Sequence, residues 1–410
     1  MRYDVIVVGA GPAGSTTALE CSGRGLSVLL LDRAEFPRDK PCGGGVTKRA
    51  YDLLSVDISP VVERVIFGLD LTVRQSMRVS RRSPAVITYL TQRSRLDAFL
   101  VERAVEAGAT LRERALLRQV ERHPSHVTVR TSDGVFEGRT LVAADGANGS
   151  TARLAGLDVG LVKGIALEGN VSTNGPFPER WDSAMGMDFG GTPGGYGWIF
   201  PKGDHLNFGV GGWKYLGPSL RARLDSLVRF YGFDPDGLHS LRGHHLPLRQ
   251  PSSPLANGNM LLVGDAAGLL DPFTGEGIYA AIWSGQAAAR HLEEYIAGEV
   301  EDLSGYGLEV ERELVPDLLV SRQFQDLFHL TPAMYMRVER ATSIIWGLAC
   351  RILRGEQTYA GVMQNHTTLA TIVEFLSDLV RVTPYLQRAA GLRDPAPPQR
   401  FFLGNSHQGS

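Results

Sequence analysis

The sequence predicts an α/β protein in which a parallel sheet with covering helices is interrupted by an antiparallel sheet and followed by a helical C-terminal region. Three observations support this fold class. A buried strand at the N-terminus runs into a glycine-rich turn and a helix, residues 165–215 form short alternating segments rich in glycine and aromatics, and the pattern beyond about residue 300 is helical. The 410 residues exceed what one hydrophobic core usually fills, so more than one structural unit is expected.

The N-terminal residues 1–32 predict a βαβ unit of the dinucleotide-binding kind. "YDVIVV" (residues 3–8) is a β-branched run, "GAGPAG" (residues 9–14) is the turn, and "SVLLL" (residues 27–31) is a second buried strand that ends at Asp32. Glycines at 9, 11 and 14 match G-x-G-x-x-G, which allows a tight turn, close approach to a pyrophosphate and close helix packing. Asp32 stands where a carboxylate can accept the ribose hydroxyls of an adenosine. The unit therefore predicts a Rossmann-like domain.

The elements that follow return to this domain more than once. Residues 89–111 predict a helix, with Leu96, Phe99, Leu100 and Ala104 on one face, and then a strand. Residues 126–147 predict a hairpin that turns at Asp133-Gly134 and continues into the strand "TLVAADG". "NMLLVGDAAG" (residues 259–268) is a further buried strand, and a helix is expected from about Gly275 to Ala297.

These elements predict a discontinuous domain organisation. The Rossmann-like domain is assigned to residues 1–65, 90–160 and 255–300, and the antiparallel sheet to residues 66–89 and 161–254. Residues 301–395 are assigned to the helical region. Residues 396–410, a polar stretch after "DPAPPQR", are expected to be disordered.

Composition and motifs exclude several classes of function. A net charge of -2 offers no general attraction to nucleic acid, and neither Walker A nor G-x-S-x-G is present. Three scattered cysteines cannot form a disulfide framework, which favours a reducing, cytoplasmic location. We expect no secretory signal and no membrane-spanning helix. His244 and His245 are adjacent and would face opposite sides of a strand, so no metal site is predicted.

Several motifs occur in a fixed order along the chain: "GAGPAG", Arg93 in "RSRLD", "AADGAN", "LLVGDAAG" and "PFTGEG". Together they resemble the FAD-dependent oxidoreductases of the p-hydroxybenzoate-hydroxylase fold. Within that group, "KPCGGG", "PGGYGWIFP" and "RGEQTY" resemble the geranylgeranyl reductase family, which hydrogenates isoprenoid double bonds. The resemblance spans about residues 1–360. In "DGANGSTAR", Arg153 stands one residue later than in many hydroxylases of this fold, so it is assigned no role.

FAD is the cofactor that the resemblance implies. Asp265 is placed to approach the ribitol or the diphosphate, and Gly275 and Gly277 open a helix whose N–H groups can face the N1 and O2 edge of a flavin. Arg93 would reach toward the ribitol or diphosphate; the alternative is a surface cation at a helix start. The predicted cofactor-binding residues are Gly9, Gly11, Ala13, Gly14, Asp32, Arg33, Cys42, Gly43, Gly44, Arg93, Asp145, Gly264, Asp265, Gly275, Gly277 and Ile278.

Cys42 is the candidate catalytic residue. It precedes three glycines, which would let the backbone pass close to a flat ring and leave the thiol facing the reacting centre. Reduction of an isolated alkene needs an acid because no carbonyl absorbs the developing charge. Cys42 is therefore expected to act either as that acid or as a polarisable group that supports positive charge on carbon. The alternative is a small buried thiol that only packs.

Substrate contacts are predicted for Tyr196, Trp198 and Phe200. Tyr196 and Trp198 have the same parity in an extended strand, so both rings point to one face. They would border a slot for an apolar chain, or else form the core of the antiparallel sheet. The apolar helix pattern in residues 340–356 is expected to pack in the core or close a substrate tunnel, with contact to a membrane surface as the alternative.

The predicted function is an FAD-dependent reductase of polyprenyl chains carried by a lipid, a quinone or a chlorophyll-type molecule. No second dinucleotide fingerprint is present, but the resemblance implies that enzymes of this fold can reduce FAD without one, so NADPH, NADH and ferredoxin are all compatible electron donors. Two alternatives stay open at this point. One is a flavin monooxygenase on the same fold, and the other is a non-catalytic prenyl-binding protein.

Overall fold

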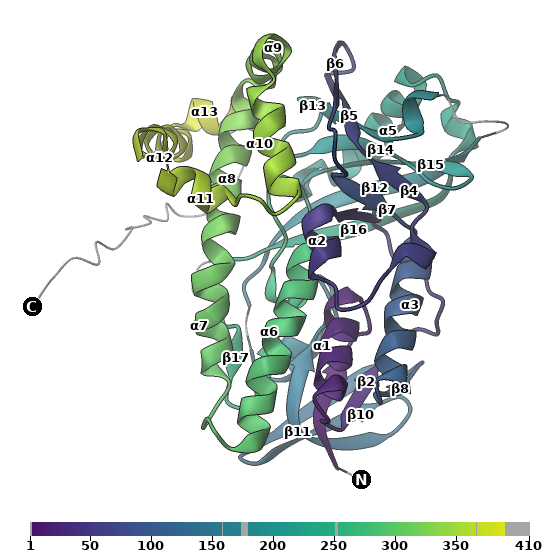
Figure 1. The fold of residues 1–410 in the computed structure, drawn as a ribbon, viewed down its shortest axis with the longest axis vertical. Coiled ribbons are helices and arrows are strands. Elements are labelled where there is room, and N and C mark those ends of the chain that lie inside the picture. The colour runs from purple at the N-terminus through teal and green to yellow at the C-terminus, as the bar shows by residue number, and fades with distance from the viewer. Residues whose placement is uncertain (1, 158, 174–178, 251–252, 366, 390–410) are drawn as a thin grey trace, which may run out of the picture.

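The computed structural model describes residues 2–157, 159–173, 179–250, 253–365 and 367–389 (Figure 1). It confirms the predicted fold class. A parallel sheet with its helices forms the lower part of the view, a largely antiparallel sheet lies above it, and C-terminal helices stand beside that second sheet. The predicted tail, residues 396–410, lies outside the described residues.

The parallel sheet draws its strands from three separate stretches of the chain. Its order is β17-β18-β11-β1-β2-β8, and every neighbouring pair is parallel except β17 with β18. β10 pairs with β11 as the predicted hairpin, and β9 pairs with β10. The strands are β1 (Arg2–Val8), β2 (Val28–Leu31), β8 (Thr110–Arg112), β9 (Leu117–His123), β10 (His126–Thr131), β11 (Val135–Ala143), β17 (Ala256–Asn257) and β18 (Met260–Leu262).

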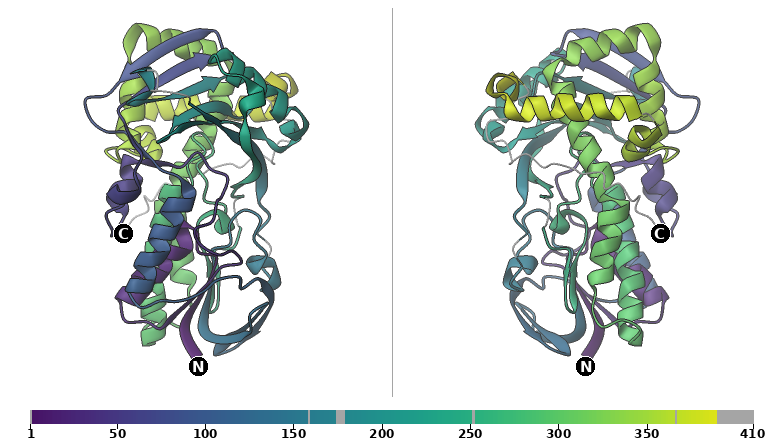
Figure 2. Two further views of the ribbon diagram at one scale, coloured as in Figure 1. Left: turned by 90° about the vertical axis from the view of Figure 1, so that its right-hand side faces the viewer. Right: turned by 90° about the vertical axis from the view of Figure 1, so that its left-hand side faces the viewer.

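Helices cover one side of this sheet, and the β9–β10 hairpin lies on the other (Figure 2). α1 (Pro12–Gly23) packs between α3 (Arg93–Glu106) and α6 (Ile278–Ala297). α1 and α6 approach so closely that a Cβ on Gly285 of α6 would lie 2.8 Å from the carbonyl oxygen of Ala13. α3 begins later than the predicted helix because β7 takes up the residues before it. A short α4 (Thr151–Leu154) and a 3₁₀ turn, η5 (Gly264–Ala267), complete this part.

The second sheet has seven strands in the order β16-β12-β15-β14-β13-β5-β6. The sequence predicts an antiparallel sheet, and the structure corrects this for one pair, because β5 and β13 run parallel. A tight turn cannot join these two segments, which are more than a hundred residues apart, so nothing local fixes their direction. The strands are β5 (Gly68–Val73), β6 (Met77–Arg82), β12 (Val162–Ser172), β13 (Ala184–Phe189), β14 (Tyr196–Pro201), β15 (His205–Trp213) and β16 (His239–Leu248).

The two faces of the second sheet have different partners. Ile199, Phe208 and Val210 point to the face that packs on α5 (Leu220–Phe230), and they belong to one hydrophobic core with its leucines. Trp198 and its neighbours of like parity point to the opposite face. Short 3₁₀ turns border the sheet: η2 (Glu179–Trp181), η3 (Lys214–Ser219) and η4 (Pro235–Gly237).

A small third sheet joins the two larger ones, and the sequence did not predict it. β7 (Thr88–Leu90) lies between β3 (Gly45–Thr47) and β4 (Arg64–Ile66), antiparallel to both. α2 (Lys48–Leu53) follows β3 directly, and η1 (Ser59–Val61) precedes β4. The sheet therefore fixes the glycine-rich segment before β3 against the start of α3.

The C-terminal region is helical, as predicted. α8 runs alongside the second sheet and contacts α11 and α12, while α9 packs on β5 and β6, and α10 contacts α2. The helices are α7 (Ser304–Glu313), α8 (Val315–Leu330), α9 (Pro332–Thr342), α10 (Ile344–Leu353), α11 (Tyr359–Asn365), α12 (Thr367–Val382) and α13 (Pro384–Ala389). No helix within the described residues is long and apolar enough to cross a bilayer.

Candidate functional site

A cavity of about 520 Å³ lies where the three parts of the molecule meet. The turn before α1 and the segment before β3 form one end of its wall, and the second sheet turns its free face toward it. Side chains of α8, α9 and α10 close the remaining side. All three predicted substrate-contact residues line this cavity, as do nine of the predicted cofactor-binding residues besides Cys42: Gly11, Ala13, Gly43, Gly44, Arg93, Asp265, Gly275, Gly277 and Ile278.

The glycines of the first motif have separate local roles. Gly9 has φ +102°, and a Cβ there would lie 2.4 Å from the carbonyl oxygen of Ala144. Gly14 lies against Gly9, with only 1.8 Å between its would-be Cβ and the Gly9 oxygen, so the turn and the helix pack tightly. Gly11 is the N-cap residue of α1 and lies on the cavity wall. No side chain in the described part of the chain accepts a hydrogen bond from the first N–H groups of this helix. The first N–H groups of α1 are therefore available to an anion.

Asp32 is held at the edge of this turn. Its carboxylate accepts hydrogen bonds from the backbone N–H groups of Ala10 at 2.8 Å and Ala34 at 2.9 Å, and it lies 3.6 Å from the guanidinium of Arg38. A carboxylate has about four acceptor positions, so ribose hydroxyls can still bind. Arg33 is exposed and does not line the cavity.

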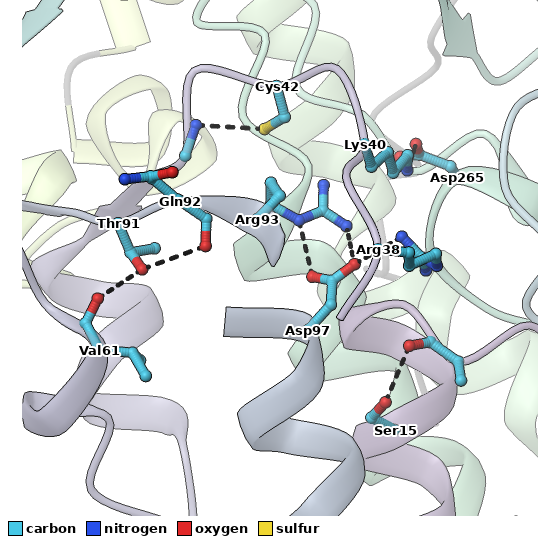
Figure 3. Close-up of polar contacts among 12 residues, drawn as sticks. Ser15, Arg38, Lys40, Cys42, Val61, Thr91, Gln92, Arg93, Asp97 and Asp265 are labelled. Carbon is cyan, nitrogen blue, oxygen red and sulfur yellow. Dashed lines mark hydrogen bonds and ion pairs between the residues drawn. The ribbon is translucent and has the colours of Figure 1, made fainter. Parts of the chain in front are cut away.

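Arg93 is buried on the cavity wall rather than exposed, being only 5% accessible (Figure 3). It forms two hydrogen bonds with Asp97, at 2.7 and 2.8 Å, and Asp97 also binds Arg38 at 3.0 Å. Burial would lower the pKa of Arg93, but Asp97 and the neighbouring Cys42 outweigh it, and the pKa is raised. The side chain is therefore a fixed cation between the cavity and the first turn of α1.

Cys42 is half-buried in the loop above Arg93 (Figure 3). Its sulfur accepts a hydrogen bond from the Gly44 N–H at 3.4 Å and interacts electrostatically with the Arg93 guanidinium. The backbone N–H of Cys42 donates to Oε1 of Glu168 at 2.8 Å. The loop is thus tied to α3 and to β12 at the same residue.

The two glycines after Cys42 are explained by protein contacts. A Cβ on Gly43 would lie 2.6 Å from the Phe200 ring, and one on Gly44 would lie 1.9 Å from the Thr91 oxygen. Gly44 also has φ +66°. Lys202, only 2% exposed, donates to the carbonyl oxygens of Gly43 at 2.6 Å and Thr91 at 2.8 Å. This clamp holds the loop against the sheet.

The second acidic motif also lines the cavity, next to the aromatic strand β14. Asp265 forms an ion pair with Lys40 at 3.4 Å, and Gly277 caps α6, whose first residue is Ile278. Gly275 has φ +69°, which favours glycine. The Tyr196 hydroxyl donates to the Thr274 carbonyl, so the aromatic strand β14 contacts this motif directly.

Like Gly9, Gly14, Asp32 and Arg33, the predicted cofactor residues Asp145 and Gly264 do not line the cavity. Asp145 is half-buried, and its carboxylate accepts hydrogen bonds from the N–H groups of Ser150 and Thr151 at 2.7 and 2.9 Å, so it shapes its own loop. Gly264 packs against Ala13, which lies on the wall. It donates its N–H to Ser284 Oγ at 3.0 Å and thereby supports the helix contact behind the cavity.

The aromatic wall is built on glycines of the neighbouring strand. Trp198 pairs with Gly209, whose would-be Cβ would lie 1.9 Å from the indole. The indole Nε1 donates to Asn207 at 2.8 Å, which fixes the ring. Tyr196 and Phe200 flank it, with ring centroids 6.2 and 6.4 Å from that of Trp198. The glycines of β15 thus make room for the rings that face the cavity.

The apolar end of the cavity lies next to this wall. Apolar side chains of β5, β13, α8, α9 and α10 line it, among them Leu71, Met185, Met187, Phe189, Phe328, Met336, Trp346, Leu348 and Ile352. Ile345, Leu348 and Ile352 belong to the predicted apolar helix, so α10 closes the cavity, whereas Ile344 is 68% exposed. The cavity therefore has a charged end and an apolar end.

Sequence reasoning missed three titratable groups near the charged end. Burial raises the pKa of Glu168 to about 7, although the Cys42 amide and Lys202 oppose the shift. Burial lowers the pKa of Lys202 to about 8, and burial together with Lys40 lowers that of His244 to about 4. For Glu168, the sequence offered only strand parity, because Ala166, Glu168 and Asn170 share a face of β12. Parity alone does not say which face of the strand lines the cavity.

His244 lines the cavity, whereas His245 Nδ1 lies 2.7 Å from Asn148 Oδ1, so the two rings face opposite sides as expected. Among the described residues, no cluster of three or more His, Cys, Asp or Glu side chains is arranged to hold a metal ion.

A family model described as an FAD binding domain matches residues 2–187. The chain is 32% identical over 346 residues to digeranylgeranylglycerophospholipid reductase 2 of Methanothermobacter thermautotrophicus, over 80% of this chain and 88% of that protein. It is 31% identical over 322 residues to geranylgeranyl diphosphate reductase of Rhodobacter capsulatus, over 74% and 78% of the two chains.

The fold has a close counterpart among solved structures. The crystal structure of a geranylgeranyl bacteriochlorophyll reductase-like protein from Thermoplasma acidophilum matches with a TM-score of 0.71 at 24% identity, over 78% of this chain and 86% of that one. The cavity residues fit FAD: uncapped N–H groups open α1 and α6, and Gly11 has no side chain that would fill the space between Arg38 and Arg93.

Proposed function

Because the chain belongs to the geranylgeranyl reductase family of FAD-dependent oxidoreductases, we propose that it hydrogenates isolated C=C bonds in the polyprenyl chain of a lipid, quinone or chlorophyll-type substrate. FAD is the cofactor, and when bound and reduced it supplies a hydride at N5. The proposal rests on one observation: a single cavity combines a charged, glycine-lined end with an apolar end.

The residues proposed to hold FAD lie at the charged end. The N-termini of α1 and α6 offer unpaired N–H groups, and Arg93 adds a fixed positive charge beside Gly11. Asp32 would accept the adenosine ribose, and Asp265 would bind the ribitol or diphosphate. The glycines at 11, 275 and 277 keep these surfaces free of side chains.

The apolar end would hold the prenyl chain. Met187 and Phe189 of β13 and Trp346 of α10 line it, and such apolar side chains suit a hydrocarbon chain. Trp198 lies between this slot and the charged end, where its ring face can stabilise positive charge on carbon. The arrangement orients an alkene between the two ends.

The chain must also supply a proton, because an isolated alkene has no carbonyl to absorb charge. Cys42 lies on the cavity wall beside Arg93, and we include it in the proposal as the acid or as a polarisable group that supports the cationic carbon. Electrons would come from a nicotinamide or ferredoxin donor. Contact with a membrane surface would give access to lipid substrates.

The proposal is tested by comparing the isoprenoid lipids and quinones of a strain that lacks this protein with those of its parent by mass spectrometry. We expect the deletion to make the target molecule lighter by two hydrogens for each bond that is no longer reduced, and the native gene to restore the parent mass. Unchanged saturation in every prenyl lipid and quinone would contradict the proposal.

A further inference from the structure

Glu168 occupies a distinctive place in the second sheet. Residues that pair directly across neighbouring strands share a face, and the row through Glu168 reads Arg242, Glu168, Gly209 and Trp198. Gly209 has no side chain, and the indole of Trp198 lies over it. Within this row, Glu168 therefore carries the polar side chain nearest to Trp198, and it lines the cavity.

One carboxyl oxygen of Glu168 is already engaged. Oε1 accepts the backbone N–H of Cys42 at 2.8 Å, which fixes the carboxyl against the glycine-rich loop. A protonated carboxyl donates through its other oxygen while the first remains an acceptor. The hydrogen bond from the loop thus leaves Glu168 able to donate a proton toward the cavity.

The charges around Glu168 do not force it to ionise. Lys202 faces it from the segment after β14, but its ammonium is committed to two backbone carbonyls. Arg93 of α3 is balanced by Asp97. Arg242 of β16 pairs with Asp39 at 3.4 Å, and Asp39 itself raises the pKa of Glu168.

Two further groups complete these surroundings. His244, which lies two residues along β16, has its pKa lowered to about 4, and the Cys42 thiol lies on the facing loop. Burial therefore dominates at Glu168 and raises its pKa to about 7.

Cys42 is arranged differently. Its sulfur accepts a hydrogen bond from the Gly44 N–H, and it interacts electrostatically with the Arg93 guanidinium. Sulfur is polarisable, so this side chain can support positive charge without giving up a proton. The geometry suits a group that supports positive charge.

We propose that Glu168 is the acid that protonates the alkene and that Cys42 is the polarisable group that supports the cationic carbon. This assignment rests on the proposed function. There, Cys42 was either the acid or the polarisable group; here the acid is Glu168 and the polarisable group is Cys42. The O–H bond of Glu168 breaks, the alkene π electrons form the new C–H bond, and the hydride bonds to the other carbon. The carboxylate then recovers a proton from water, so atoms and charges balance.

The first test is the pH profile of kcat for prenyl reduction by the holoenzyme, with a geranylgeranyl substrate. In the wild type, kcat is expected to fall as pH rises through about 7, because the required form is the protonated carboxyl. Glu168→Gln keeps an acceptor for the Cys42 N–H but cannot donate an acidic proton. Its kcat should fall roughly 100-fold or more and lose that pH dependence.

Two variants act as controls. Cys42→Ala should have a lower kcat than wild type, and its kcat should fall with pH in the same way. Glu168→Asp should restore part of the kcat and part of its pH dependence. A Glu168→Gln variant within threefold of wild type, or loss of the pH dependence in Cys42→Ala instead, would overturn the assignment. A wild-type protein that reduces no prenyl chain would contradict the proposed function itself.

A second measurement does not depend on activity. A carboxyl whose pKa is raised by folding contributes stability in acid that is lost as pH rises through the folded pKa, here about 7. The urea midpoint of wild type, with and without added FAD, should therefore fall relative to that of Glu168→Gln as pH rises from about 5 to about 8. Parallel midpoints across this range would show that Glu168 carries no proton and would overturn the proposal even if activity were absent.

Discussion

Gly43 and Gly44 are glycines for different physical reasons. Gly43 leaves room for the Phe200 ring, and Gly44 combines a left-handed backbone with a close approach to the Thr91 carbonyl. Both keep the Cys42 loop pressed against the second sheet, where Lys202 clamps it. The need for glycine at these positions therefore comes from the protein's own packing as well as from any bound ring.

Gly44→Ala should destabilise the protein by roughly 3 kcal/mol or more, because left-handed strain and a steric clash act together. Gly25→Ala is the matched control, since Gly25 has φ +81° but nothing within 4 Å of its would-be Cβ. It should cost only about 1 to 2 kcal/mol. Urea unfolding of both variants provides the comparison, and equal losses would show that the Thr91 contact does not restrict this position.

At single residues, the sequence could predict what local chemistry requires. The turn glycines at 9, 11 and 14 are recognisable because their spacing serves one backbone shape, and the structure gives that shape. Glu168 and Lys202 could not be recognised, because their pKa shifts arise from burial beneath segments distant in the chain. Arg33 illustrates the opposite case, since it follows the motif in sequence and yet points to solvent.

At the level of elements, β15 shows how glycines in one strand leave room for the side chains of the neighbouring strand. Gly209 lies opposite Trp198, and the indole lies over it because Gly209 has no side chain. The alternation of "HLNFGVGG" indicated a strand correctly. The alternation could not indicate that a glycine of this strand lies beneath an aromatic ring of β14, because that contact depends on how the strands pair.

Gly209→Ala should displace the Trp198 ring, because the added methyl would lie 1.9 Å from it. We expect a loss of about 1 to 3 kcal/mol in unfolding free energy, together with a shift in tryptophan fluorescence. The matched control is Gly243→Ala in β16, where the new Cβ would meet only Ala166 O at an ordinary 3.5 Å. If both variants left the emission spectrum unchanged, the role of Gly209 in leaving room for the Trp198 ring would be wrong.

Element order was predictable wherever neighbours in sequence are neighbours in space. The hairpin at Asp133-Gly134 and the βαβ unit both follow from short connections. The parallel pairing of β5 with β13 and the small sheet around β7 were missed, because each joins segments separated by other elements. Helix α10 was predicted from its apolar spacing, and its place at the cavity follows only from the folded chain.

At the scale of the whole molecule, the cavity exists because three structural parts close around it. The parallel-sheet part supplies the helix N-termini and the charged end, the second sheet supplies the aromatic wall, and α8 to α10 supply the apolar end (Figure 1). No one of these parts contains the whole site. The fold alone does not decide between reduction and oxygenation, because one fold can host different reactions.

The most direct test of the account is a single turnover without oxygen. The holoenzyme is reduced chemically, mixed anaerobically with a geranylgeranyl substrate, and the product is analysed by mass spectrometry while flavin absorbance is followed. The account predicts that the flavin is reoxidised by the substrate and that the product gains two hydrogens for each bond reduced. A flavin that stays reduced until oxygen is admitted, with a product that has gained an oxygen atom, would contradict it.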